Sequence, residues 1–165
     1  MGRGGILGIL AILLILTACG GGPRFETDDV TLSVTPEQAA EEPERLEGIR
    51  ILWGGVIVRA VNQEERTRLE VLAYPLDSEQ RPDTETKAGI RFLAEKAGYL
   101  ETADYAPGRR VTVKGTLQGI REGRIGEAPH TYPVVQVSDL HLWPMAEARR
   151  SGPRLHFGIG VIFGN

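Results

Sequence analysis

The chain has 165 residues, with 19 Lys and Arg against 22 Asp and Glu and a formal net charge of −3. This length supports one compact domain with room for an anchor or a tail, and 41% hydrophobic with 25% charged residues is typical of a globular chain. The near-neutral balance argues against nucleic acid as a partner, because coating nucleic acid requires a basic field. A single cysteine excludes an internal disulfide framework.

The first 19 residues have the three regions of a secretory signal. Arg3 supplies a positive charge, an apolar run of 11 residues extends from Ile6 to Leu16, and small residues precede Cys19. The run is shorter than the roughly 20 apolar residues of a transmembrane helix. Leu16-Thr17-Ala18-Cys19 also matches the bacterial lipobox, in which the cysteine sulfur receives a diacylglycerol and the chain is cleaved before it. We predict a signal peptide over residues 1–18 and a lipidated Cys19, with a plain signal and an unmodified cysteine as the alternative.

Residues 19–47 are predicted to form a flexible tether that begins with the lipidated cysteine. Gly20-Gly21-Gly22-Pro23 comes first, and residues 24–47 are acidic with few large apolar side chains, a composition typical of linkers. Within the tether, Thr35-Pro36-Glu37-Gln38 has the pattern of a helix N-cap followed by proline at the first helical position. We therefore expect one short helix over residues 36–42, which Pro43 limits.

A β domain is predicted over residues 48–145, because the apolar period changes to two near Ile49. A first strand over 49–61 is interrupted by Gly54-Gly55, where we expect a bulge or a sharp coil that lets the strand belong to both sides of a barrel. Residues 66–73 alternate as an antiparallel partner strand, and 75–89 form a polar surface loop. Residues 90–100 fit either helical or strand spacing, and a strand is favoured.

Two further strands complete the predicted domain. Residues 110–117 alternate after a turn at Pro107-Gly108, and 133–143 return after a hairpin turn expected at Glu122-Gly123. The apolar phase of the returning strand shifts, which predicts a bulge at Ser138 or Asp139. This order of elements is typical of a mainly β fold: a small, closed, OB-like barrel with at most one short helix. A β-sandwich is the alternative.

Seven short stretches of the chain, in order, resemble one known family. They are Leu52-Trp53-Gly54-Gly55-Val56-Ile57 and the segments 69–77, 91–94, 108–115, 125–127, 132–135 and 142–144. Together they resemble the Slp family of bacterial outer-membrane lipoproteins. The resemblance implies an outer-membrane lipoprotein with a starvation or stress role and no established catalytic activity. It supplies no active-site residues, and only Cys19 carries over with a chemical role.

A basic and aromatic surface is the candidate ligand face. It consists of Arg109, Arg110, Lys114, Arg121 and Arg124, with Tyr99 and Tyr105 nearby in the sequence. On OB folds such a face binds oligonucleotides or sugars. In the bacterial envelope, an anionic glycan or a lipid headgroup is the more plausible ligand, bound mainly by Arg109, Arg110 and Lys114. A solvated barrel face without a ligand is the alternative.

No catalytic residues, cofactor or metal site are predicted. His130, His141 and His156 are far apart and lack the short spacing of metal ligands. The chain has no Gly-x-Ser-x-Gly elbow, Walker loop or His-Glu-x-x-His motif. The carboxylate pairs, such as Glu64-Glu65, lie in predicted turns or in the tether, where solvated charge is expected.

The Gly- and aromatic-rich tail over residues 146–165 leaves three alternatives open. Apolar and other residues alternate over 155–163, and we expect either a last strand on the domain's own sheet or a mobile tail, a strand that pairs with a partner protein, or a lipid-facing strand. We predict a non-enzymatic outer-membrane lipoprotein, anchored by acyl chains on Cys19, with its β domain facing the periplasm. Its role would be envelope-structural or stress-related, with an envelope glycan, lipid or protein as candidate partner.

Overall fold

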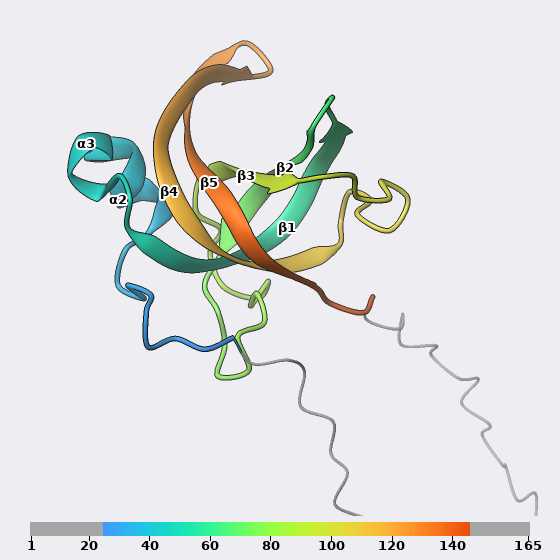
Figure 1. Ribbon diagram of the computed structural model, residues 1–165, viewed down its shortest axis with the longest axis horizontal. Helices are drawn as coiled ribbons and strands as arrows, with labels where there is room; N and C mark the ends of the chain where they lie inside the picture. The colour runs from blue at the N-terminus through green and yellow to red at the C-terminus, as the bar shows by residue number, and fades with distance from the viewer. Residues whose placement is uncertain (1–24, 146–165) are drawn as a thin grey trace, which may run out of the picture.

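The computed structural model describes residues 25–145, and its five strands form a closed barrel in the order β1-β2-β3-β5-β4 (Figure 1). The strands are β1 Arg50–Asn62, β2 Arg66–Tyr74, β3 Arg91–Ala97, β4 Arg110–Ile125 and β5 Ala128–Leu142. β3 and β5 pair in parallel, whereas the other neighbouring strands are antiparallel. The predicted closed β-barrel is therefore confirmed, and the sandwich alternative is wrong. The favoured strand within residues 90–100 is β3.

β1 closes the barrel by pairing with two strands at once. Gly54 pairs with Tyr74 of β2 and with Thr112 of β4, and Gly55 is likewise shared. A Cβ at Gly54 would overlap the side chain of Leu76, and one at Gly55 would overlap the backbone of β2. The glycines are therefore required by close approach, as expected for a strand shared between two sides of a barrel. The register shift itself lies further along β1, between Ile57 and Arg59.

β4 and β5 form a long hairpin that rises beyond the other strands at the top of Figure 1. The turn predicted at Glu122-Gly123 is wrong, because β4 continues to Ile125 and the chain turns at Gly126-Glu127. Gly123 serves packing instead: a Cβ there would lie 2.9 Å from the ring of Tyr132. The predicted bulge is confirmed at Ser138, since Lys114 pairs with Asp139 and Gly115 with Val137.

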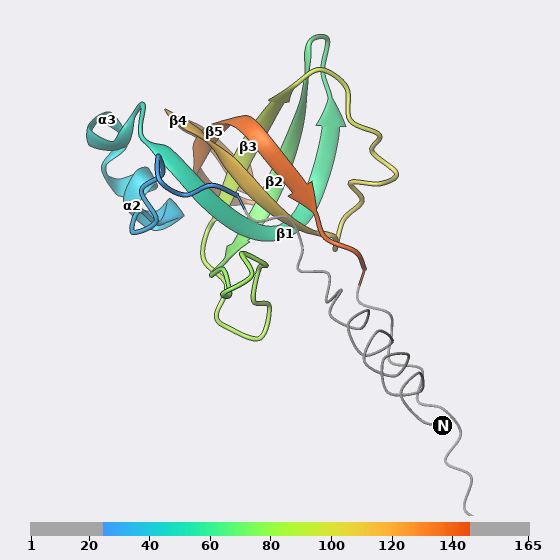
Figure 2. The ribbon, with the colours of Figure 1, turned by 60° about the horizontal axis from the view of Figure 1, so that its bottom comes forward.

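The segment from residue 25 to residue 47 folds against the barrel and is not a flexible tether. It contains α2 Pro36–Glu41, which Thr35 caps as predicted, and a one-turn helix, α3 Pro43–Leu46, in addition to the one expected. Both views place the two helices together at one side of the barrel (Figure 2). Pro36, Ala39 and Leu46 are buried, so a few apolar residues at suitable positions help to attach a segment whose composition resembles a linker.

The core fills the barrel with inward-facing side chains of all five strands. Trp53 and Phe92 pack edge to face, with ring centroids 5.2 Å apart. The largest fully buried side chains also include Ile51, Ile57, Leu69, Leu117, Val71, Val111, Val113 and Val135. Between residues 25 and 145, neither helix has the length and apolar character needed to cross a membrane. The rigid barrel leaves its outer face and the long loops to form sites.

Candidate functional site: an apolar groove beside the N-terminal segment

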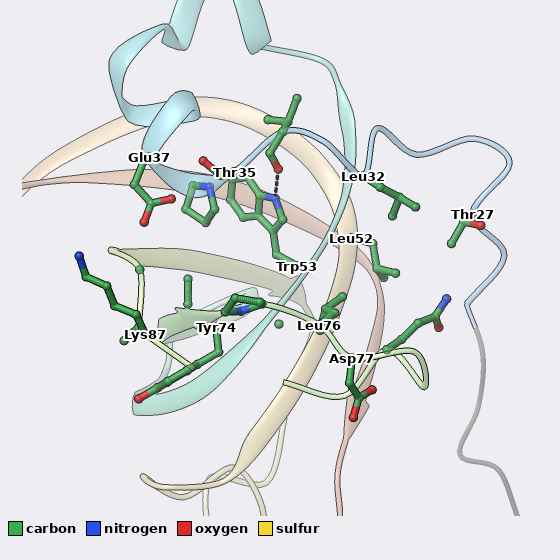
Figure 3. Close-up of a pocket in the computed structure, with 18 residues that line it drawn as sticks. Thr27, Leu32, Thr35, Glu37, Leu52, Trp53, Tyr74, Leu76, Asp77 and Lys87 are labelled. Atoms are coloured by element: carbon green, nitrogen blue, oxygen red, sulfur yellow. Dashed lines mark hydrogen bonds between the residues drawn. The ribbon is translucent and has the colours of Figure 1, made fainter. Parts of the chain in front are cut away.

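A half-open groove of about 640 Å³ lies between the N-terminal segment, β1, the end of β2 and the loop over residues 75–89 (Figure 3). Its walls are mainly apolar, and they include the side chains of Leu32, Val34, Trp53, Tyr74 and Leu76. Leu32 is 61% exposed, so it adds solvent-accessible apolar surface to the groove. The volume lies within the range of about 300–1,000 Å³ typical of small-molecule sites.

The loop over residues 75–89 forms one wall and is held by polar contacts. The Asp77 carboxylate accepts hydrogen bonds from the backbone N–H groups of Glu79 (2.8 Å) and Arg81 (2.9 Å). From β4, the Thr112 hydroxyl donates to the carbonyl of Gln80 over 2.6 Å. The Arg81 guanidinium also stacks over the Trp143 ring, 5.0 Å from its centroid. These contacts fix the loop although it has little secondary structure of its own.

The opposite wall is the N-terminal segment, which β4 and the loop hold in place. Lys114 Nζ lies 2.8 Å from the Asp29 carboxylate and donates to the Glu26 carbonyl over 2.8 Å. Hydrogen bonds from Lys114 and Arg50 lower the pKa of Asp29. Deeper in, the Trp53 indole N–H donates to the Val34 carbonyl over 2.7 Å, as Figure 3 shows. The groove thus depends on contacts between residues far apart in the sequence.

The polar groups that line the groove are largely committed to folding. Glu37, labelled with Lys87 on one side of Figure 3, accepts the backbone N–H of Ile90 over 2.8 Å. Thr35 caps α2, and Asp77 closes its own loop. The apolar wall, together with Lys87 and the Tyr74 hydroxyl, is therefore what this site offers to a ligand. Such a surface favours binding of an apolar group over proton transfer or nucleophilic attack.

The structure does not bring the five predicted basic residues into one face. Arg109 donates to the carbonyls of Asp104 (2.9 Å) and Trp143 (3.0 Å), and Arg110 donates to Thr84 (2.6 Å). Lys114 holds the N-terminal segment. Further along β4, Arg121 pairs with Glu95 over 3.0 Å and Arg124 donates to the Glu127 carbonyl. The five side chains are therefore engaged at five separate places.

The remaining candidate residues are also scattered. Tyr99 is 70% exposed, whereas Tyr105 is half-buried and burial raises its pKa. His130 packs edge to face on Tyr132, and His141 on Trp143, where burial lowers the pKa of His141. Within residues 25–145, no three His, Cys, Asp or Glu residues are grouped to hold a metal ion. Cys19, His156 and the tail lie outside the described residues.

Two buried carboxylates on β2 and β3, outside the groove, were missed by sequence reasoning. Glu95 accepts hydrogen bonds from Arg66 (2.7 Å), Arg68 (2.9 Å) and Arg121 (3.0 Å). Burial raises the pKa of Glu95, but the hydrogen bonds from the three arginines outweigh this effect, so the pKa lies below its ordinary value. Glu70 likewise pairs with Arg91 over 2.7 Å. The run of charges on the polar face of residues 66–73 was a signal for Glu70, whereas Glu95 lies outside that run.

Comparison with known proteins identifies the family. The sequence model of the "Outer membrane lipoprotein Slp family" matches residues 16–160. The chain belongs to this family. It is 33% identical to the uncharacterized lipoprotein YeaY of Escherichia coli over 152 residues, which cover 86% of this chain and 75% of that protein. It is 28% identical to the outer membrane protein Slp of Escherichia coli, over 94% of this chain and 84% of that protein.

Family membership makes the protein an outer-membrane lipoprotein, as the sequence resemblance predicts. Among solved structures, a small single-stranded DNA-binding protein from Streptomyces coelicolor is similar with 22% identity and a TM-score of 0.36, over 58% of this chain and 94% of that protein. A likeness this weak transfers no DNA binding to the Slp-family chain. The family and the fold are thus established, while the ligand has to be argued from the site.

Proposed function

We propose that Cys19 carries the lipid anchor of this Slp-family protein after removal of residues 1–18, and that the barrel faces the periplasm. The lipobox around the chain's one cysteine supports the anchor. Phe25, the first residue that the structure describes, is held to Gln80 by two hydrogen bonds of 2.6 and 3.0 Å and lies six residues after Cys19 in the sequence. Six extended residues reach about 20–22 Å. The anchor therefore keeps the barrel close to the lipid headgroups.

Substitution of Cys19 tests the anchor. In cells that express Cys19→Ser, we expect the protein to leave the outer-membrane fraction, because acyl chains supply the hydrophobic attachment. The intact mass of the wild-type protein extracted from membranes should show cleavage before Cys19 and added acyl groups. A Ser33→Ala variant is a matched control for expression and fractionation. Wild-type levels of Cys19→Ser in the outer membrane, or an unmodified thiol, would contradict the anchor.

For the anchored domain, a non-enzymatic role in envelope structure or stress adaptation is the function we propose, exerted by binding an apolar group in the groove. An acyl chain of an envelope lipid has the matching chemistry. The observation that carries this proposal is the contrast between an apolar wall with an exposed Leu32 and polar lining groups already hydrogen-bonded within the fold. Headgroup or glycan binding by Arg109, Arg110 and Lys114 is less well supported, because these donors hold other segments of the chain.

Titration with a fluorescent fatty acid tests the groove. The purified full chain in neutral detergent should bind the probe saturably, and Leu32→Gln should weaken binding roughly tenfold, in line with the loss of one buried leucine contact of about 1.5 kcal/mol. Ile120→Gln is the matched control, since Ile120 is 39% exposed on β4 and does not line the groove. Equal affinities of the two variants, or no saturable binding by the wild type, would contradict the proposal.

A further inference from the structure

A second, smaller depression lies on the outer face of the barrel, away from the groove. It measures about 160 Å³ and is lined by Arg59, Val61, Arg68, Glu70 and Leu93. Its residues come from β1, β2 and β3, the strands that Figure 2 shows side by side and that pair directly in register. Val61 is 40% exposed and Leu93 is buried, so the depression has apolar surface between two guanidinium groups.

Buried Glu95 holds one set of arginines at this surface. Its side chain is 5% exposed, whereas those of its partners Arg66 and Arg121 are 47% and 42% exposed. Arg68, which lines the depression, uses its Nε for Glu95 and only a 3.3 Å contact from Nη2 for Gln63. Each guanidinium has five N–H donors. The carboxylate thus fixes three guanidinium groups while most of their donors remain directed elsewhere.

Glu70 holds the other arginines of this surface, and their positive charges compensate the charge of its carboxylate. Its Oε1 accepts from Arg91 at 2.7 Å and from the Tyr132 hydroxyl at 3.3 Å. The Arg59 guanidinium lies 3.7 Å from Oε2, beyond hydrogen-bond distance, its side chain is 71% exposed, and this side chain makes no hydrogen bond to any residue in the 25–145 range. Five arginines face two carboxylates, which leaves three positive charges in excess across one connected surface.

We propose that this arginine surface, formed by Arg59, Arg66, Arg68, Arg91 and Arg121, binds the phosphate of an anionic lipid headgroup. The planar guanidinium matches phosphate geometry with two parallel hydrogen bonds. Fixing the arginines on buried carboxylates before binding reduces the entropy lost when a ligand arrives. The apolar surface of Val61 and Leu93 suits the glycerol and upper acyl carbons next to the phosphate. The protein belongs to an outer-membrane family, so such headgroups surround it.

This inference is independent of the groove and of the Cys19 anchor. It places a second binding site on β1, β2 and β3, whereas the groove lies against the N-terminal segment and the 75–89 loop. Failure of fatty-acid binding would leave the arginine surface unaffected. Conversely, loss of headgroup binding in an arginine variant should leave fatty-acid binding unchanged. The two proposals can therefore be separated in the same preparation.

Titration of the purified full chain in neutral detergent tests the arginine surface. The probes are short-chain phosphatidylglycerol, short-chain phosphatidylcholine and inorganic phosphate. The binding of each probe is measured by calorimetry. We expect saturable binding of phosphatidylglycerol that weakens as salt is raised, because salt screens exposed charges. Arg59→Gln should weaken this binding at least tenfold without affecting the thermal midpoint, since the Arg59 side chain makes no hydrogen bond in the described part of the chain. Arg45→Gln, at an exposed arginine of α3, is the matched control.

The outcomes distinguish the phosphate of an anionic lipid headgroup from free phosphate. Binding of phosphatidylglycerol that Arg59→Gln weakens and Arg45→Gln leaves unchanged would support the proposal. Equal binding of phosphatidylcholine, binding of inorganic phosphate alone, or equal affinity of Arg59→Gln and wild type would overturn it. Arg66→Gln gives a second test at the far end of the surface. Its circular dichroism spectrum shows whether the fold survives the loss of one Glu95 partner.

Discussion

The two outer faces of the barrel both carry basic side chains, but they use them differently. On the groove side, Arg110 and Lys114 extend from β4 to hold the 75–89 loop and the N-terminal segment. On the opposite side, Arg66 and Arg68 of β2 meet the buried carboxylate of Glu95 and stay partly exposed. Arg110 and Lys114 join segments of the chain, whereas Arg66 and Arg68 remain accessible to solvent. Partners, more than residue type, decide which basic residues are available to a ligand.

The same contrast explains why the groove is apolar although charged residues surround it. Lys114 is paired with Asp29 and with the Glu26 carbonyl, so it is removed from the wall, and Lys87 is the one basic side chain of the described residues that lines the groove. What remains is the surface of Leu32, Leu76 and their neighbours. The arginine surface has the reverse arrangement, because its carboxylates are buried and its cations lie outside. Substitutions on the two sides should therefore lower the free energy of unfolding for different physical reasons.

The largest effect is expected on the groove side, at Trp53. Trp53→Ala should lower the free energy of unfolding by about 3–5 kcal/mol, because it leaves a cavity beside Phe92. It also removes the donor that holds the Val34 carbonyl, so proteolysis within residues 25–47 should accelerate. Urea unfolding and limited proteolysis measure the two effects. Trp53→Phe is the control for volume, and a loss below about 1 kcal/mol in Trp53→Ala would contradict the proposed role.

A smaller effect is expected on the arginine side, at Glu95. Glu95→Gln should lower the free energy of unfolding by about 1–3 kcal/mol at neutral pH. Three guanidinium groups lose a charged acceptor but remain partly solvated. Since the folded-state pKa of Glu95 lies below its ordinary value near 4.5, its stabilisation is complete above that value. It is lost as the pH falls through the folded-state pKa.

The pH dependence of the free energy of unfolding distinguishes the contribution of Glu95 from that of other carboxylates. Unfolding free energies measured between pH 6 and pH 3 should fall less steeply in Glu95→Gln than in the wild type. Glu64→Gln removes an exposed carboxylate from the β1–β2 turn and is the matched control. Identical acid profiles for Glu95→Gln and the wild type would show that the arginines do not favour the ionised form of Glu95.

The smallest effect is expected at the helix cap that begins α2. Thr35→Ala should lower the free energy of unfolding by about 1 kcal/mol, because the Gln38 backbone N–H loses its acceptor. The N-terminal segment should nevertheless stay on the barrel, since Ala39, Leu46 and the Trp53 contact remain. Thermal unfolding measures the loss, with Ser33→Ala as an exposed neighbour for comparison. A loss as large as that of Trp53→Ala would mean that capping, and not packing, attaches the segment.

Several elements could be predicted because their signals are local. The alternation over residues 66–73 and 110–117 places strands correctly, since side chains on a strand point to opposite faces in turn. The phase shift near Ser138 predicts the bulge for the same reason. Gly123 misled the turn prediction, because a glycine that makes room for Tyr132 looks the same in sequence as a glycine that turns the chain. Linker composition also misled, because a few buried residues (Pro36, Ala39 and Leu46), together with polar contacts such as that of Glu37 to Ile90, hold residues 36–46 on the core.

The sequence by itself determines the β-barrel, the membership of the Slp family and the expected anchor at Cys19, because periodicity and short motifs are read from neighbouring residues. Only the tertiary structure decides which charges are available and where the groove lies. Lys114 meets the Glu26 carbonyl across 88 positions, and Arg68 meets Glu95 across 27. Free energies of desolvation and pairing depend on distances in space, and these distances exist only once the barrel has closed.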